Sequence, residues 1–195
     1  MSNPTRPDAI ADAYSEHAAE YESEANQQSC WGKLARVELD AISIGAHRTC
    51  VADVGCGTGT ALVELAGRVG PTTRLIGIEP APGMRAIASQ RTSALPNVSI
   101  LEGRFEALPL PDQSVDQLYS IHAFHWVREI DRGIAELRRV LTPNADLDLY
   151  FVGPGTGKES VMRGATVSIE KRLWAYSEDV ARASRNTEPG DPRTC

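Results

Sequence analysis

Three glycines and an acidic residue lie where a predicted strand gives way to a predicted helix. Residues 50–54 form a short apolar run, glycines follow at positions 55, 57 and 59, and apolar residues then recur at helical spacing over 61–69. Glycine allows positive φ and lets a ligand approach without a Cβ in the way. A helix start offers unpaired N–H groups. The pattern is typical of a turn that binds a nucleotide-like ligand.

A second apolar run, 75–78, ends in Glu79. Glu79 follows Gly59 by about twenty residues, the distance at which a second strand presents a carboxylate to a ribose. A dinucleotide fingerprint reads Gly-x-Gly-x-x-Gly, whereas this chain reads Gly-x-Gly-x-Gly with Asp53 at the strand end. The spacing therefore counts against an NAD-type oxidoreductase but leaves it as an alternative.

The stretches 51–59 (Val-Ala-Asp-Val-Gly-Cys-Gly-Thr-Gly) and 77–80 (Gly-Ile-Glu-Pro) resemble motifs I and II of the class I S-adenosylmethionine-dependent methyltransferases. The resemblance extends over roughly residues 8–152. It implies that S-adenosylmethionine is the cofactor and that the chain is an enzyme that acts on a small-molecule acceptor. The polar start of the chain and the lack of a membrane-spanning run predict a cytoplasmic protein, and the cysteine and histidine spacing predicts no metal site.

The resemblance assigns roles at the first two strands. Gly55 and Gly57 pass beside the methionine end, with Cys56 as a small residue of the loop rather than a nucleophile. Asp53 orients the loop or accepts from the ammonium group, and Glu79 accepts from both ribose hydroxyls. Two further residues are expected to give adenine an apolar face: Pro80 and Met84.

The loop 103–109 departs from the family pattern Gly-Asp-Ala-Glu-x-Leu-Pro. Arg104 replaces the aspartate that commonly accepts from the adenine amino group, and Phe105 replaces a small residue. Backbone contacts near Phe105 are still expected, and Ser120 at the end of the fourth strand is expected near the methionine moiety. Tyr14 and Tyr21 have the spacing of a Tyr-x(6)-Tyr pair that lies over the methyl donor in the family.

Two histidines follow the fourth strand within His-Ala-Phe-His-Trp-Val. Methyl transfer is an in-line displacement, and a neutral histidine can take the proton of a hydroxyl nucleophile. His122 and His125 are therefore the candidate catalytic residues. A hydrogen-bonded packing role is the alternative for both, and Trp126 is expected to be a pocket wall or a core residue.

The rest of the chain predicts alternating strands and helices, which favour an α/β fold with a doubly wound, Rossmann-like parallel sheet. Two capping helices precede the sheet, the second with Trp31, Leu34, Val37 and Ala41 on its inner face. The predicted helices are 8–24, 31–43, 58–69, 84–90 and 130–141, and the predicted strands are 51–54, 74–78, 97–101, 115–120 and 147–152.

We expect capping helices over 1–45, a cofactor-binding domain over 46–185 and a disordered tail over 186–195. The family's sheet usually has seven strands, but the residues after 152 offer one helical pattern over 161–180 and at most one weak strand near 165–170. The sheet edge at the C-terminal end is therefore expected to be shortened. A shortened edge favours association, and a homodimer is one outcome.

Composition limits the function classes. The 195 residues suffice for one domain with a core, and the formal charge of −6 argues against non-specific binding to nucleic acid or an anionic membrane. No apolar run is long enough to span a membrane. Four cysteines show no metal-ligand spacing.

The sequence predicts methyl transfer from S-adenosylmethionine to a small molecule. One alternative is a protein that binds the methyl donor but has little or no turnover because the sheet edge is shortened. The other is the NAD-type oxidoreductase. A nucleic-acid methyltransferase is disfavoured, since no Asn-Pro-Pro-Tyr-like tetrad follows the fourth strand.

Overall fold

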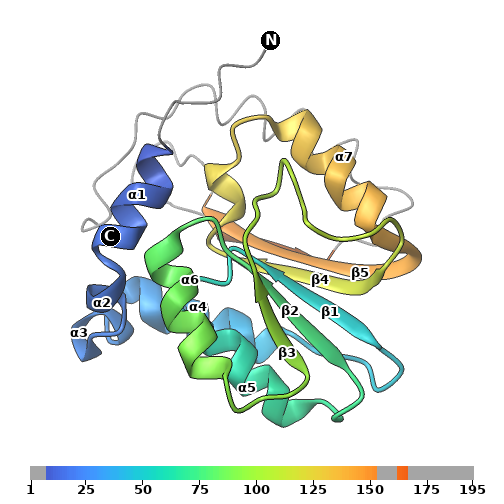
Figure 1. The fold of residues 1–195 in the computed structure, drawn as a ribbon, viewed down its shortest axis with the longest axis horizontal. Coiled ribbons are helices and arrows are strands. Elements are labelled where there is room, and N and C mark those ends of the chain that lie inside the picture. The colour runs from blue at the N-terminus through green and yellow to red at the C-terminus, as the bar shows by residue number, and fades with distance from the viewer. Residues whose placement is uncertain (1–7, 153–161, 167–195) are drawn as a thin grey trace.

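The structure is a computed structural model that describes residues 8–152 and 162–166 of the chain (Figure 1). Four helices precede the sheet, and strands then alternate with helices. The helices are α1 (Ala9–Glu16), α2 (Ala18–Tyr21), α3 (Glu24–Gln27), α4 (Cys30–Ala41), α5 (Thr60–Arg68), α6 (Pro82–Thr92) and α7 (Ile130–Val140), with a 3-10 turn, η1, at Phe124–Trp126. The strands are β1 (Cys50–Val54), β2 (Arg74–Ile78), β3 (Val98–Leu101), β4 (Val115–Ile121), β5 (Leu141–Val152) and β6 (Met162–Thr166).

The six strands form one sheet in the order β3-β2-β1-β4-β5-β6. The first five are parallel, and β6 runs antiparallel to β5. The strand order reverses at β1, which pairs with β2 on one side and β4 on the other. Ligands of such sheets bind outside the carboxyl ends of the strands at this reversal. The predicted doubly wound α/β fold is confirmed.

Helices cover both faces of the sheet (Figure 1). On one face α7 places Ile134, Leu137 and Val140 in a core with alternate residues of β1, β2, β4 and β5. On the other face Leu62 and Leu65 of α5 and Leu39 of α4 pack on Val51 and Tyr119. Strand β1 is buried along its whole length, which explains its unbroken apolar run.

The predicted helix over 8–24 is wrong in its continuity. His17 ends α1, and Ser23 begins α3 by accepting from the N–H of Asn26 at 3.2 Å. The predicted inner face of α4 is also wrong in part. Val37 is 64% exposed, whereas the neighbouring Glu38 and Leu39 are buried.

Two differences lie near the C-terminal end of the sheet. Strand β5 begins at Leu141 and runs through Pro143, whereas the predicted strand begins only at residue 147. The register between β4 and β5 shifts between Val115 and Gln117, and this irregularity accommodates the proline.

The predicted helix over 161–180 is wrong at 162–166. Those residues form β6, which satisfies the edge of β5 with Asp148 opposite Thr166 and Val152 opposite Met162. The remainder of that predicted helix and the predicted disordered tail lie outside the described residues.

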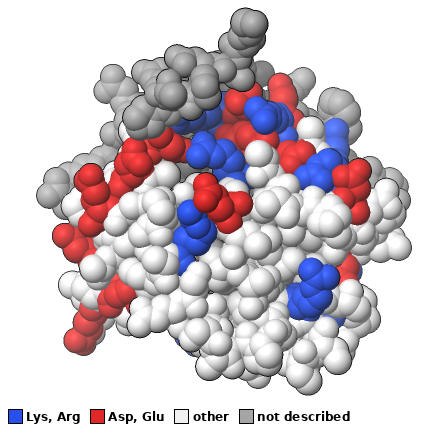
Figure 2. All heavy atoms as spheres, in the orientation of Figure 1, with Lys and Arg blue, Asp and Glu red and all other residues white. Residues whose placement is uncertain are grey.

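Within residues 8–152 and 162–166, no helix is long and apolar enough to cross a membrane. On the face seen in Figure 2, acidic side chains gather along the edge where α1–α3 lie, and Lys and Arg side chains are interspersed with Asp and Glu elsewhere.

Candidate functional site

The glycine loop after β1 adopts the backbone geometry that its sequence predicts. Gly55, Gly57 and Gly59 have φ of 80°, 54° and 79°. The N–H groups of Gly55 and Cys56 both donate to the carbonyl of Ile78, at 2.8 and 3.2 Å, and thereby attach the loop to the end of β2. Gly59 begins α5 in the left-handed conformation. Only glycine adopts three such positions at little cost.

Gly55 and Gly57 differ in what surrounds them. A Cβ at Gly55 would lie 2.1 Å from the Cβ of Ala123, so this glycine is required for the loop to pack on the segment after β4. A Cβ at Gly57 would have no atom within 4 Å. The space beside Gly57 is therefore open to a ligand.

The carboxylate of Glu79 joins the ends of β1 and β2. Its Oε2 accepts from the N–H of Gly57 at 2.9 Å, and its Oε1 accepts from the N–H of Ala81 at 2.9 Å. Burial raises the pKa of Glu79, and the two backbone donors partly offset that rise. Each oxygen keeps a second lone pair, so the carboxylate can still accept from a pair of hydroxyl groups.

Asp53 lies beneath the glycine loop and is only 3% exposed. It stands opposite Tyr119 in the register of β1 and β4, and the two side chains interact. Burial raises the pKa of Asp53 to about 8, with a further contribution from Glu79. The side chain is thus held against β4 two residues before Gly55, and its role toward the loop or the ammonium group stays a prediction.

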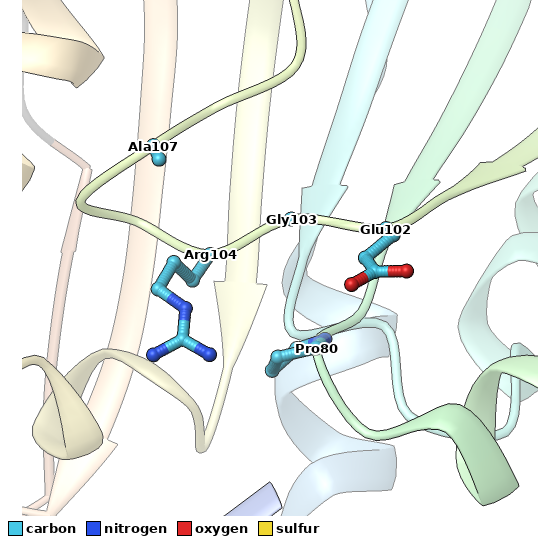
Figure 3. Close-up of a pocket in the computed structure, with 5 residues that line it drawn as sticks. All are labelled: Pro80, Glu102, Gly103, Arg104 and Ala107. Atoms are coloured by element: carbon cyan, nitrogen blue, oxygen red, sulfur yellow. The ribbon is translucent and has the colours of Figure 1, made fainter. Parts of the chain in front are cut away.

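A pocket of about 240 Å³ opens beside the ends of β2 and β3. It is lined by Pro80, Glu102, Gly103, Arg104 and Ala107. Figure 3 shows the guanidinium of Arg104 and the ring of Pro80 facing each other across it. Glu102 is turned to the opposite end, where it pairs with Arg85 at 2.8 Å. The structure therefore brings Pro80 and Arg104 together next to Glu79.

Arg104 is paired with the N-terminal segment. Its Nη1 lies 2.7 Å from Oδ2 of Asp8, and Nη2 of Arg128 lies 3.3 Å from Oδ1 of the same carboxylate. Asp8 also begins α1 by accepting from the N–H of Ala11 at 3.4 Å. The basic residue that replaces the family's aspartate thus faces an acidic residue supplied by α1.

Helix α1 lies against α6, at the side of the sheet where Glu79 ends β2 (Figure 1). The Ser15 hydroxyl accepts from the N–H of Gly83 at 3.1 Å. The rings of Tyr14 and Tyr21 are 5.4 Å apart. Burial raises the pKa of Tyr21, with contributions from Tyr14 and Glu79. The predicted tyrosine pair is therefore brought together near Glu79.

Three predicted residues turn their side chains away from an open site. Met84 is buried between α1 and α6 with Ala11 and Ala18, so its side chain does not reach the pocket. Phe105 is buried in the main core, with its ring 5.0 Å from that of Phe124, and leaves only its backbone for a ligand. Cys56 is a buried free thiol whose pKa is raised by burial, which suits a space-filling residue.

The end of β4 brings polar groups to the same edge of the sheet. Ser120 is fully buried, and its hydroxyl has no hydrogen-bond partner among the described residues. Burial lowers the pKa of His125 to about 4, with a contribution from His122. The ring of Trp126 lies 6.1 Å from that of Tyr14. His125 is thus neutral near pH 7.

His122 contacts a residue that we did not predict. Its Nε2 lies 2.8 Å from Oε2 of Glu38, a buried carboxylate of α4. Glu38 and Asp8 reach the site from elements far away in sequence. An acidic residue within the buried stripe of α4 was the available signal for Glu38, whereas nothing local in the sequence marks Asp8.

Residues 52–147 match the family model of the methyltransferase domain. Among curated relatives, the malonyl-[acyl-carrier protein] O-methyltransferase of Methylococcus capsulatus is 38% identical over 126 residues, which are 64% of this chain and 45% of that protein. The 2-phytyl-1,4-naphtoquinone methyltransferase of Trichormus variabilis is 33% identical over 125 residues, 54% of each chain. The chain spans 32% to 55% of the lengths of these and other curated relatives.

Two solved structures share the fold. A SAM-dependent methyltransferase from Aquifex aeolicus superposes with a TM-score of 0.60 at 22% identity, over 87% of both chains. A putative methyltransferase of Haloferax volcanii, solved with the Trm112 activator, gives 0.66 at 24% identity, over 88% of this chain and 76% of that one.

The glycine loop, the acid that ends β2 and the five parallel strands define a nucleotide-binding methyltransferase fold. Residues 52–147 match the methyltransferase-domain family, and a SAM-dependent methyltransferase has the same fold, so S-adenosylmethionine is the cofactor to test against this site. The residues present fit this cofactor where Gly57 leaves open space beside the Glu79 carboxylate. The fit differs from the usual pattern at Arg104, which donates hydrogen bonds where the family commonly has an acceptor.

Proposed function

We propose that this chain transfers a methyl group from S-adenosylmethionine to a small-molecule acceptor by in-line displacement. The observation that carries the proposal is the Glu79 carboxylate, fixed by the N–H groups of Gly57 and Ala81 beside the open space at Gly57. The curated relatives named as methyltransferases support the same chemistry for the matched residues.

In this proposal the chain's own residues do four things. Glu79 accepts hydrogen bonds from the two ribose hydroxyls, while Gly57 leaves open space for the methionine end and Gly55 lets the loop pack on Ala123. Pro80 and Arg104 border the position of the base, and the Tyr14–Tyr21 pair covers the site from α1. The bound cofactor supplies a methyl group on a positively charged sulfur, and the protein supplies alignment of the acceptor with it.

The acceptor is proposed to be a small molecule rather than nucleic acid. Basic side chains on the face seen in Figure 2 are interspersed with acidic ones, which is not the arrangement that a phosphate backbone attracts. The proposed place of action is the cytoplasm. Association of two copies through the sheet edge stays a prediction.

Calorimetric titration of the purified chain with S-adenosylmethionine and, separately, with NAD tests the proposal against the oxidoreductase. We expect heat of binding with the methyl donor only. Tight binding of NAD in place of the donor would refute the proposal.

Incubation with tritiated donor and a pool of small-molecule acceptors then separates an enzyme from a protein that only binds. We expect label in the extracted products, at a level well above that given by Glu79→Ala. Donor binding with no labelled product would favour the binding protein.

A further inference from the structure

A buried carboxylate contacts His122, one of the two histidines that follow β4. Glu38 projects from α4, is 6% exposed, and places its Oε2 at 2.8 Å from Nε2 of His122. A carboxylate in such a place needs a partner that offsets its desolvation. The contact is close but not an aligned hydrogen bond, and neither atom has another hydrogen-bond partner among the described residues, so each is the partner that a small reorientation of the other would reach. The natural arrangement is a neutral imidazole with its proton on Nε2, which leaves Nδ1 free to accept a proton.

The backbone of His122 is held in an unfavourable conformation. Its φ of 56° makes it one of only two non-glycine residues with positive φ in the part of the chain that the structure describes. Its N–H donates to the carbonyl of Tyr150 at 2.8 Å, which ties the residue to β5. Conformations of this kind persist only where the surrounding structure imposes them, and they concentrate at functional sites.

The Glu38–His122 pair lies next to the glycine loop. The next residue, Ala123, is the one that a Cβ at Gly55 would strike, so the segment after β4 packs directly on the loop. Trp31, about two helical turns before Glu38 on α4, presents its ring edge-on to the imidazole at 5.5 Å and 81°. The imidazole therefore has an acid on one side, an aromatic wall beside it and the cofactor loop nearby.

We propose that Glu38 is a positioning residue that fixes His122 as the base of the reaction, and that the acceptor is a molecule whose attacking oxygen carries a proton, such as a phenol or an enol. This inference rests on the function proposed above. The acceptor's O–H proton passes to Nδ1 of His122, and the oxygen forms a bond to the methyl carbon. The electron pair of the broken C–S bond stays on sulfur, which becomes a neutral thioether.

The Glu38–His122 pair favours a hydroxyl acceptor, because an acceptor that is already ionised does not need a base. A carboxylic acid is already ionised near pH 7 and attacks without a base. A hydroxyl nucleophile gains from a positioned base, which typically contributes about 10²- to 10⁴-fold in rate. His125 stands close to His122, but the lowered pKa of His125 makes it a weak base at neutral pH.

The first test measures the tautomer of His122 and needs no acceptor. Nitrogen-15 NMR of the imidazole groups distinguishes the two neutral tautomers, and His122→Gln identifies the signal of His122 among the four histidines of the chain. We expect a single Nε2–H tautomer in the wild type and a mixture in Glu38→Gln. A wild-type His122 with its proton on Nδ1, or with both tautomers averaging, would overturn the pairing.

The second test reads the acceptor class by transfer of tritiated methyl to matched probes, 1-naphthol and catechol against 1-naphthoate. We expect transfer to the hydroxyl probes, a loss of at least about tenfold in Glu38→Gln and a larger loss in His122→Gln. Glu38→Asp should recover part of the activity. Asp40→Asn is the matched control, because Asp40 is an exposed acid on the same helix that pairs with Arg36 and Arg68.

Calorimetry with the methyl donor keeps the two proposals apart. Unchanged donor affinity in Glu38→Gln, together with the loss of transfer, supports the positioning role. Three results would overturn it, each in a protein that binds the donor. They are methyl transfer to 1-naphthoate alone, no transfer to either hydroxyl probe, and full transfer by the Glu38→Gln variant. Absence of donor binding in the wild type would instead refute the proposed function, and the NMR result on Glu38 and His122 would still stand.

Discussion

The proposed binding of the cofactor's ribose depends on the Glu79 carboxylate, which is held in place by backbone hydrogen bonds and still has free lone pairs. Two backbone donors, from Gly57 and Ala81, set the direction of its oxygens before a ligand arrives. A carboxylate held in this way loses little conformational freedom when it binds two hydroxyl groups. The same contacts attach the glycine loop to the end of β2, so one residue both shapes the site and binds in it.

Arg104 shows how a departure from a family pattern can be compensated by a residue from elsewhere. We predict that Arg104→Gln and Asp8→Asn each destabilise the protein by removing the same ion pair, so that the double variant loses less stability than the sum of the two. Asparagine at position 8 keeps an N-cap for α1. Urea unfolding in a double-mutant cycle should give a coupling of at most about 1 kcal/mol, since the pair is partly exposed. The coupling should shrink in high salt. Independence of the two substitutions at low salt would contradict the pairing.

At the scale of elements, the glycine loop divides its glycines between folding and binding. Gly55 makes room for Ala123, whereas Gly57 makes room for nothing in the protein itself. The distinction could not be made from sequence, where the two glycines look equivalent.

We predict that Gly55→Ala lowers the free energy of unfolding more than Gly57→Ala. The second substitution carries only the left-handed penalty of about 1–2 kcal/mol, whereas the first adds a steric clash to it. Gly57→Ala should nevertheless weaken binding of the methyl donor while the protein stays folded. Urea unfolding and calorimetry measure the two effects. A Gly57→Ala variant that binds the donor like the wild type would show that the open space beside Gly57 is not used.

Most of the parallel sheet was predictable, because buried strands and amphipathic helices alternate along the sequence. The exceptions have local or long-range causes. His17 interrupts the first predicted helix, and the register shift opposite Gln117 lets β5 begin before its proline. Residues 162–166 pair with the edge of β5, and the demand of that edge for backbone partners outweighs the helical period of the sequence.

The candidate site was predictable where its residues follow one another in a motif. The glycine loop and Glu79 are examples, since their spacing alone places them at neighbouring strand ends. The contacts of Glu38 with His122 and of Asp8 with Arg104 join distant parts of the chain. Glu38 is marked only as an acid within the buried stripe of α4, and no local pattern marks Asp8. The side chains of Phe105 and Met84 are buried in the cores, and the predicted contacts of the Phe105 backbone and of Met84 with the cofactor stay predictions.

At the scale of the whole molecule, burial of titratable groups makes stability depend on pH. The pKa of His125 is lowered to about 4 by burial and by His122, whereas an unfolded histidine titrates near 6.5. Between these values the unfolded chain binds a proton that the folded chain does not, so stability falls as the pH drops from about 6.5 to 4. Asp53 acts in the opposite sense, because burial raises its pKa to about 8.

We predict that His125→Gln reduces the loss of stability on acidification by up to about 3 kcal/mol between pH 6.5 and pH 4. Urea unfolding at a series of pH values measures this difference. His17→Gln is the control, because the His17 side chain is 59% exposed and should leave the pH dependence unchanged. Parallel curves for the wild type and His125→Gln would show that His125 takes up its proton in the folded protein as readily as in the unfolded one.

The central claim is that Glu79 and the glycine loop bind S-adenosylmethionine. Calorimetric titration with this donor, applied to Glu79→Gln and Asp112→Asn side by side, tests it most directly. Both variants exchange a carboxylate for an amide, but Asp112 is 76% exposed, pairs with Arg139 and lies before the start of β4, away from the carboxyl ends of the strands. We predict that Glu79→Gln weakens donor binding at least tenfold, about 1.4 kcal/mol, while Asp112→Asn binds like the wild type. Equal affinities in the two variants would contradict the account.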